Sequence, residues 1–139
     1  YNGNILGPTL LMHKGDEVVI NVTNQLGEPT TTHWHGLHLP AIMDGGPHQR
    51  IENGQTWQAR YTIINEEATF WYHPHLEGKT AEHVYHGLAG LLIVKDPLSD
   101  LDLPDQYGID DIPVIVQDKV IAADGSFNYP GTRFGVKGD

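Results

Sequence analysis

The chain has 139 residues, enough for one domain with a sizeable core, and its 39% hydrophobic and 19% charged content is typical of a globular protein. The formal net charge of −10 argues against nucleic acid or an anionic membrane surface as a partner. The absence of cysteine excludes disulfides, thiolate catalysis and thiolate-ligated metals. Any metal site must therefore be built from the nine histidines and from oxygen ligands.

Short strand-like segments alternate with turns rich in glycine and proline along the whole chain. We expect strands at 9–13, 17–24, 31–38, 56–64, 68–75, 88–96 and 112–121, and one short helix at 79–87. The alternation is clearest in the fourth segment, where Trp57, Ala59, Tyr61 and Ile63 fall on one face. Pro74 is typical of a strand end, because proline cannot donate to a central ladder. Many short strands at this spacing predict an all-β sandwich or barrel.

The sequence contains no segment that is typical of membrane insertion or export. Its longest run without a polar side chain, residues 87–94, is too short to cross a bilayer. No charged and apolar stretch of the signal-peptide kind opens the chain. We therefore predict no membrane span. These features do not determine the cellular compartment of the protein, because a mature secreted protein would also lack a signal peptide.

Two His-x-His pairs, His33/His35 and His73/His75, are the clearest candidates for a chemical role. Alternate residues of a strand share a face roughly 6.6 Å apart, so one pair suits two metals of a cluster better than one mononuclear site. Trp34 should point to the opposite face. Nine histidines in 139 positions give about half of one such pair by chance. Spacing alone is therefore also compatible with two histidine pairs, in the core or at the surface, that make ordinary hydrogen bonds and bind no metal.

The surroundings of these histidines resemble a known family. HWHGLHLP (33–40), MDGGP (43–47), FWYHPH (70–75) and GKTAEHVYHGLAGLLIV (78–94) are similar, in order and spacing, to the first cupredoxin domain of multicopper oxidases. That family includes laccases, bilirubin oxidases and bacterial cuprous oxidases. The opening YNGNILGPTLLMHKGDEVVINVTN and the later VIVQDKVIAADGSF (114–127) also resemble it. The resemblance covers essentially the whole chain and implies a cupredoxin-like Greek-key β-sandwich or barrel.

The resemblance also implies a copper-binding role for the two histidine pairs. In the family, a trinuclear cluster of one type 2 copper and a type 3 copper pair takes four histidines from the first domain and four from the last. His33 matches the type 2 ligand of the first domain. His35 and His73 match ligands of one type 3 copper, and His75 matches a ligand of the other. We therefore expect copper as the cofactor.

Asp44 matches an acidic residue of the family that assists proton delivery while O2 is reduced, which is a reaction that consumes protons. The alternative is a plain turn residue ahead of two glycines. One departure from the family is the HPHLEG stretch, because many bacterial members read HPHxHG. Leu76 and Glu77 stand at those positions here. This change removes none of the matched copper ligands.

The remaining histidines have no copper role in the resemblance. We expect His38 at the surface or at the rim of the site, facing away from the cluster, and His13 and His48 in solvent. His83 and His86 lie three residues apart on the predicted helix, a spacing that can bring two ligands together. An exposed helical face is the prediction for both.

Residues 1–121 are interpreted as a first cupredoxin domain that lacks its N-terminal strand, and residues 122–139 as a linker into a second one. The type 1 copper of the family needs a cysteine, and the other half of the cluster lies in a C-terminal domain. We therefore predict an oxidoreductase domain that is inactive alone. Its partners would be the other cupredoxin domains, O2 and a small reducing substrate such as a phenol, a tetrapyrrole or cuprous ion.

Two alternatives remain at this stage. Some relatives keep the architecture, have lost the ligands and serve as copper-free scaffolds in cell division. A stand-alone copper-binding module is the other alternative. By family resemblance, the location would be periplasmic, extracellular or at the cell surface.

Overall fold

The computed structural model describes residues 1–3 and 5–131, and strands dominate their regular structure. The strands are β1 (Leu10–His13), β2 (Glu17–Thr23), β3 (His33–His35), β4 (Thr56–Thr62), β5 (Ala68–His73) and β6 (Gly90–Lys95). A 3-10 turn, η1, spans Ala41–Met43, and the helix α1 spans Thr80–Tyr85. Six of the predicted strands and the helix are thereby confirmed. β5 ends directly before Pro74, as expected.

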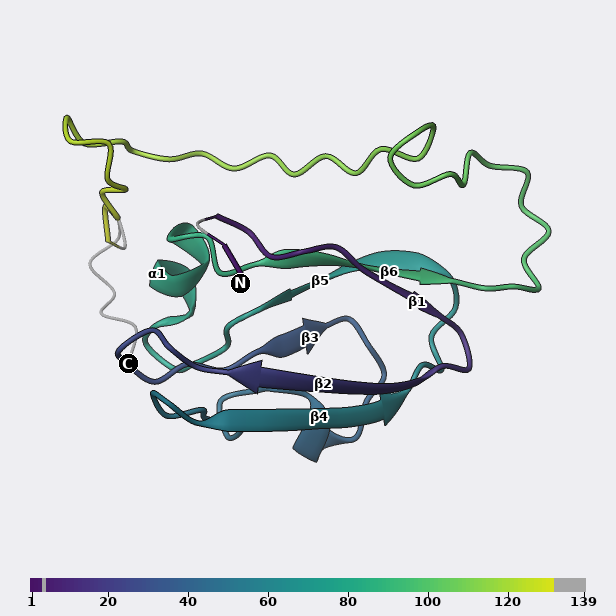
Figure 1. Cartoon of the computed structure of the whole chain (residues 1–139), viewed down its shortest axis with the longest axis horizontal. Coiled ribbons are helices and arrows are strands. Elements are labelled where there is room, and N and C mark those ends of the chain that lie inside the picture. Colours follow the sequence, from purple (N-terminus) through teal and green to yellow (C-terminus); the bar gives the residue numbers. More distant parts are fainter. Residues whose placement is uncertain (4, 132–139) are drawn as a thin grey trace.

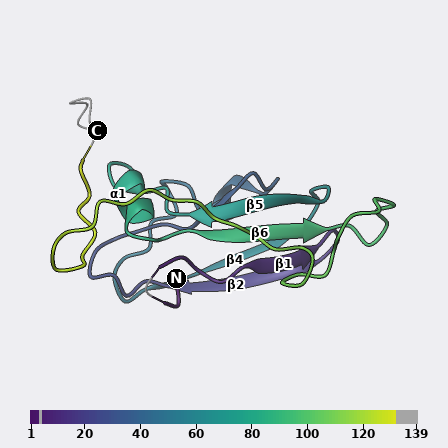
Figure 2. The same cartoon turned by 90° about the horizontal axis from the view of Figure 1, so that it is seen from above.

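The strands form two facing sheets (Figure 1; Figure 2). One sheet has the order β1-β6-β5-β3, in which β1 runs parallel to β6 and the other pairs are antiparallel. The other sheet is the antiparallel pair β2-β4. Side chains from both sheets fill the space between them: Met12, Trp34, Leu37, Ala59, Tyr61, Ile63, Tyr72, Leu92 and Val94. The predicted all-β sandwich is confirmed.

The period of two in β4 explains how the smaller sheet faces this core. Ala59 and Tyr61 are buried, as is Ile63 just beyond the strand, while Arg60 and Thr62 between them are exposed. Alternate residues of a strand point to opposite faces, so one face packs and the other meets water. The predicted orientation of this strand is confirmed.

The predicted strand at 112–121 is wrong. The chain is extended there, but among the described residues it pairs with no neighbouring strand, and Ile112, Val114 and Val116 are 65%, 77% and 91% exposed. A strand needs a partner for its backbone N–H and C=O groups, so β-branched composition alone does not make one. Figure 1 shows the segment after β6 passing back along the sheet and returning to α1.

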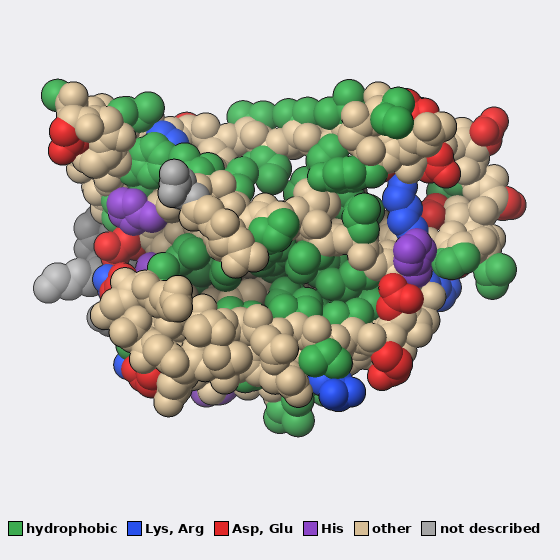
Figure 3. All heavy atoms as spheres, viewed as in Figure 1, with side chains coloured by type: hydrophobic (Ala, Val, Ile, Leu, Met, Phe, Trp, Pro, Cys, Tyr) green, Lys and Arg blue, Asp and Glu red, His purple; other side chains and the backbone are tan. Residues whose placement is uncertain are grey.

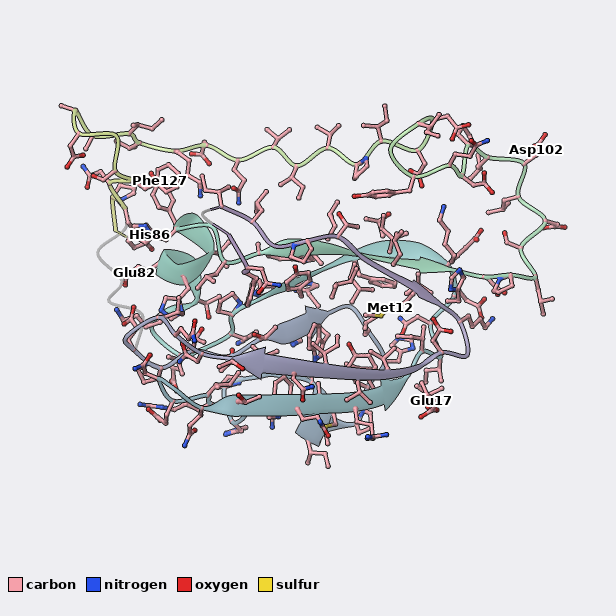
Figure 4. The ribbon with its side chains drawn as sticks, viewed as in Figure 1. Met12, Glu17, Glu82, His86, Asp102 and Phe127 are labelled. Carbon is pink, nitrogen blue, oxygen red and sulfur yellow. The ribbon has the colours of Figure 1, made fainter. Side chains whose placement is uncertain are left out.

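A groove opens between the free edges of the two sheets, where Figure 3 shows hydrophobic side chains in the interior. It has a volume of about 420 Å³ and is lined by apolar residues that include Leu10, Ile20, Trp34 and Tyr72. Met12 lies between the sheets in Figure 4. The histidine pairs are absent from this lining. In the part of the chain that is described, no helix has both the length and the hydropathy to cross a membrane.

Candidate metal centre

The register of β3 on β5 brings the histidine pairs together. His33 lies opposite His73, and His35 lies opposite Trp71, in an antiparallel ladder. Directly opposed residues in such a ladder project to the same side of the sheet. Trp34, between the two histidines of β3, turns inward, is 1% exposed and stacks on Trp57 with ring centroids 6.4 Å apart. The prediction that Trp34 points away from the histidine face is confirmed.

Three of the four predicted ligands offer nitrogen atoms that lie within 4.8 Å of one another: His33, His35 and His73. His35 Nδ1 and His73 Nε2 are hydrogen-bonded at 3.1 Å. Two nitrogens that bind one ion at about 2.0–2.1 Å with a tetrahedral angle lie roughly 3.3 Å apart. The spacing therefore suits one ion shared by His35 and His73, and imidazole donors suit copper.

His75 stands beside this trio rather than inside it. Its ring centroid is 5.2 Å from that of His33 and 6.1 Å from that of His73, and its side chain is exposed. The backbone N–H of His75 donates to Thr31 Oγ1 at 2.6 Å. The structure thus gathers all four predicted histidines on one face, three of them closely.

Backbone carbonyls fix the orientation of two of the imidazoles. His33 Nδ1 lies 2.9 Å from the carbonyl oxygen of Asp44, and His73 Nδ1 lies 2.6 Å from that of Pro74. A carbonyl oxygen can only accept, so Nδ1 carries the proton in both rings. Nε2 of each ring is therefore unprotonated, which is the usual arrangement for a metal-binding histidine, and that of His73 accepts from His35 Nδ1 at 3.1 Å.

Asp44 lies next to the histidine face, where the sequence placed it. Its Oδ2 is 3.2 Å from His33 Nδ1, and its side chain is 34% exposed. The loop that carries it packs tightly on β3: a Cβ at Gly45, whose φ is +74°, would overlap the carbonyl oxygen of Thr32. Asp44 therefore belongs to the turn and also presents a carboxylate to the centre. Its role in proton delivery stays a prediction.

Burial keeps one imidazole of the centre neutral. His73 is 5% exposed, and desolvation lowers its pKa to about 4. The hydrogen bond to the Pro74 carbonyl acts in the opposite direction, while the charges of His33, His35 and His75 lower the pKa further. Metal ions bind the unprotonated ring, so His73 is ready to bind a metal at neutral pH without first losing a proton.

Comparisons with known proteins identify the family of this chain. The family model described as multicopper oxidase matches residues 1–99. The chain belongs to the multicopper oxidase family. It is 45% identical to the multicopper oxidase mco of Staphylococcus aureus over all of this chain and 31% of that protein. It is also 40% identical to the cell division protein FtsP of Escherichia coli, over 99% of this chain and 30% of that protein.

Solved structures of multicopper oxidases share the cupredoxin-like fold of this chain. A laccase from Pediococcus acidilactici aligns with a TM-score of 0.86 and 36% identity, over 94% of this chain and 28% of the laccase. The laccase-like CueO of an Ochrobactrum species aligns with a TM-score of 0.81 and 44% identity, over 85% of this chain and 27% of that structure. The chain spans about a third of the length of its curated multicopper oxidase relatives.

Two residues next to the centre of this multicopper oxidase domain were not predicted from the sequence to lie there. Trp71 stacks on His73 with ring centroids 4.0 Å apart, and its ring lies 5.2 Å from that of His35. Its position two residues before His73 in a strand was a usable signal, because such residues share a face. Thr31, which holds the backbone of His75, carried no signal because its partner lies 44 residues away.

Four of the remaining histidines lie where the sequence predicted. His13, His38, His48 and His86 are exposed. The backbone N–H of His38 donates to Asn65 Oδ1 at 2.8 Å, which fixes the turn after β3 and leaves the His38 ring outside the cluster. None of the four joins the group of close imidazole nitrogens found among the described residues.

The prediction for His83 is wrong. The side chain is 4% exposed instead of lying on an exposed helical face. Its Nδ1 is 3.2 Å from Thr30 Oγ1, and its Nε2 is 3.2 Å from Glu28 Oε1. The helix turns this residue toward the loop before β3, where two polar partners satisfy the ring. Both partners lie more than fifty residues away in the sequence, so helical spacing alone could not indicate them.

Proposed function

We propose that this chain is the first cupredoxin domain of a laccase-like multicopper oxidase. It would contribute His33, His35, His73 and His75 to a type 2/type 3 trinuclear copper cluster. The observation that carries the proposal is the group of three imidazole nitrogens within 4.8 Å, with the ring of His75 beside it. Copper held there would supply one-electron redox chemistry for the reduction of O2 to water.

The residues of the chain have separate tasks in this proposal. His33 presents Nε2 as the type 2 ligand while Asp44 holds its other nitrogen. His35 and His73 share one type 3 copper, which their 3.1 Å nitrogen separation supports, and His75 serves the other. The partly exposed carboxylate of Asp44 holds and delivers protons at the edge of the centre.

The remaining parts of the catalytic machinery would come from other cupredoxin domains. A type 1 copper site of this family needs a cysteine, and this chain has none. The chain also covers 31% of the Staphylococcus aureus relative, so it corresponds to one part of a longer polypeptide there. We infer that the domain is inactive alone, that phenols, tetrapyrroles and cuprous ion are the candidate substrates, and that the protein works outside the cytoplasm.

A copper-free scaffold in cell division is the second candidate. The observation that favours it is the 40% identity to the cell division protein FtsP of Escherichia coli. The presence of all four matched histidines, gathered on one face, favours copper binding instead. The two functions differ in a property that can be measured directly, which is the copper content of the purified protein.

The test uses the full-length natural protein, loaded with copper, and its His35→Ala and His73→Ala variants. We expect both substitutions to abolish O2 consumption and to lower the copper content, because each removes a ligand. The matched control is His38→Ala, which removes an exposed imidazole three residues from His35. Full activity in His35→Ala would contradict the ligand assignment. A wild-type protein that folds but retains no copper would favour the scaffold.

A further inference from the structure

His83 is the one buried histidine of the described residues that lies outside the proposed copper centre. It makes two polar contacts through opposite sides of its ring, to Thr30 Oγ1 and to Glu28 Oε1, each at 3.2 Å. An ionised carboxylate only accepts hydrogen bonds, so Nε2 carries the proton and donates it to Glu28. His83 therefore joins α1 to the loop that precedes β3.

A second contact reinforces the same junction. Lys79, at the start of α1, lies 3.1 Å from the other carboxylate oxygen of Glu28 and 3.1 Å from Glu82 Oε2. The hydrogen bond from Lys79 lowers the pKa of the Glu28 carboxyl, and the bond from His83 lowers it further. Glu28 thus stays ionised and keeps accepting from both. The buried ring and the exposed ammonium hold the helix on the loop from two sides.

This junction lies directly behind two of the proposed ligands. Thr30 pairs with Ile51 through two backbone hydrogen bonds, and the next residue, Thr31, accepts the backbone N–H of His75. Thr31 and Thr32 are fully buried and lead straight into His33. A shift of the loop at Thr30 would therefore move the support of His75 and the start of β3 together.

The N-terminal end of α1 also holds the residue that follows this histidine. The backbone N–H groups of Lys79 and Thr80 both donate to the carbonyl of Leu76, as does Thr80 Oγ1, each at 3.0 Å. Leu76 follows His75 directly in the chain. His75 is thus held between Thr31 on one side and α1 on the other. Its side chain is exposed and lies outside the close trio.

We propose that His83 is a positioning residue of the copper centre, which sets the place of His75 relative to His33 by holding α1 on Glu28 and Thr30. The proposal rests on the proposed function, in which His75 and His33 bind copper. His83 touches neither ligand and acts through the Thr31 hydroxyl and the turn at Leu76. Loss of its two hydrogen bonds would loosen the centre without removing a ligand.

The experiment measures Cu(II) retention in the full-length protein, as copper bound per molecule in competition with a chelator. The variants are His83→Leu, which fills the space without hydrogen bonds, and His83→Gln, which can keep one of them. The matched control is His86→Leu, at the C-terminal end of the same helix but exposed, where the ring lies edge-on to that of Tyr85 with centroids 5.8 Å apart (His86 is labelled in Figure 4). Thermal unfolding of each metal-free variant identifies a temperature at which all are folded, and retention is compared there.

We expect His83→Leu to bind copper about tenfold more weakly, His83→Gln to fall between it and the wild type, and His86→Leu to match the wild type. A purely structural role would lower the unfolding temperature of His83→Leu and leave copper retention of the folded protein unchanged, which would overturn the proposal. If His83→Leu does not fold, the same comparison is made with His83→Gln, where about threefold weaker binding is expected and unchanged retention is the contrary result.

His33→Ala separates this proposal from the proposed function. Copper loss in His33→Ala together with unchanged retention in the His83 variants would refute the positioning role alone. Unchanged retention in His33→Ala would remove the copper centre, and the positioning role with it. Loss in both, with His86→Leu intact, is the result that both proposals predict.

Discussion

The two faces of the β3–β5 ladder carry opposite kinds of side chain. On the inner face, Trp34 pairs with Tyr72 and packs into the core between the sheets. On the outer face, His33 and His35 lie against His73 and Trp71. The same few residues of backbone position both sets, because successive side chains of a strand alternate. A rigid packed face thus fixes the spacing of the imidazoles on the other face, and the predictions below separate the two contributions.

The largest expected effect is on the inner face. Trp34→Ala removes a fully buried indole that contacts Trp57, Tyr61 and Tyr72. We expect a loss of about 3–5 kcal/mol in the free energy of unfolding, measured by urea denaturation of the metal-free protein. The control is His35→Ala on the outer face, which we expect to cost less than about 1 kcal/mol because that side chain is exposed. Similar losses for the two variants would contradict the division between the faces.

The second effect is at the loop that holds His33. Gly45→Ala strains a left-handed backbone position and pushes a methyl group into the Thr32 carbonyl, so we expect a loss of about 2–4 kcal/mol in unfolding free energy. Gly54→Ala is the control, because Gly54 also has a positive φ, of +82°, but has open space around it. It should cost only about 1–2 kcal/mol. Equal losses for Gly45→Ala and Gly54→Ala would show that the close approach of the loop to β3 adds nothing to the loss of stability.

The third effect is a pH dependence of stability that arises at His73, on the outer face. The pKa of His73 is about 4 in the folded protein, below the ordinary histidine value of 6.5. Between these values the unfolded chain binds more protons at this residue, so folded stability falls as the pH drops. The contribution of His73 is about 2 kcal/mol between pH 7 and pH 5 in the metal-free protein. Urea denaturation at both pH values, with His73→Gln for comparison, measures it. An unchanged pH slope in His73→Gln would be the contrary result.

Local patterns were sufficient for much of the fold and for the two histidine pairs that the fold brings together. The period of two predicted the orientation of Trp57, Ala59 and Tyr61, and the two His-x-His pairs identified four residues that do lie together. Period and spacing are properties of neighbouring residues, so they can be read from the chain directly. The identity of a copper site came from the family resemblance, since spacing alone left ordinary histidine pairs open.

Long-range partners account for what the sequence did not predict. The burial of His83 depends on Glu28 and Thr30, more than fifty residues earlier. The segment 112–121 has strand composition but no strand beside it in the described part of the chain, and its backbone pairing there is limited to its last residues, through the isolated bridge between Ile121 and Phe127. The pairing register that sets His33 opposite His73 is likewise a property of the folded sheet. No local pattern contains these partners.

The most direct test of the proposed copper centre is a crystal structure of the copper-loaded, full-length protein with anomalous scattering recorded at the copper edge. We predict copper peaks within bonding distance, about 2.0–2.1 Å, of ring nitrogens of His33, His35, His73 and His75, with His35 and His73 sharing one peak. Copper bound elsewhere, or a histidine face without copper in a protein that contains the metal, would contradict it.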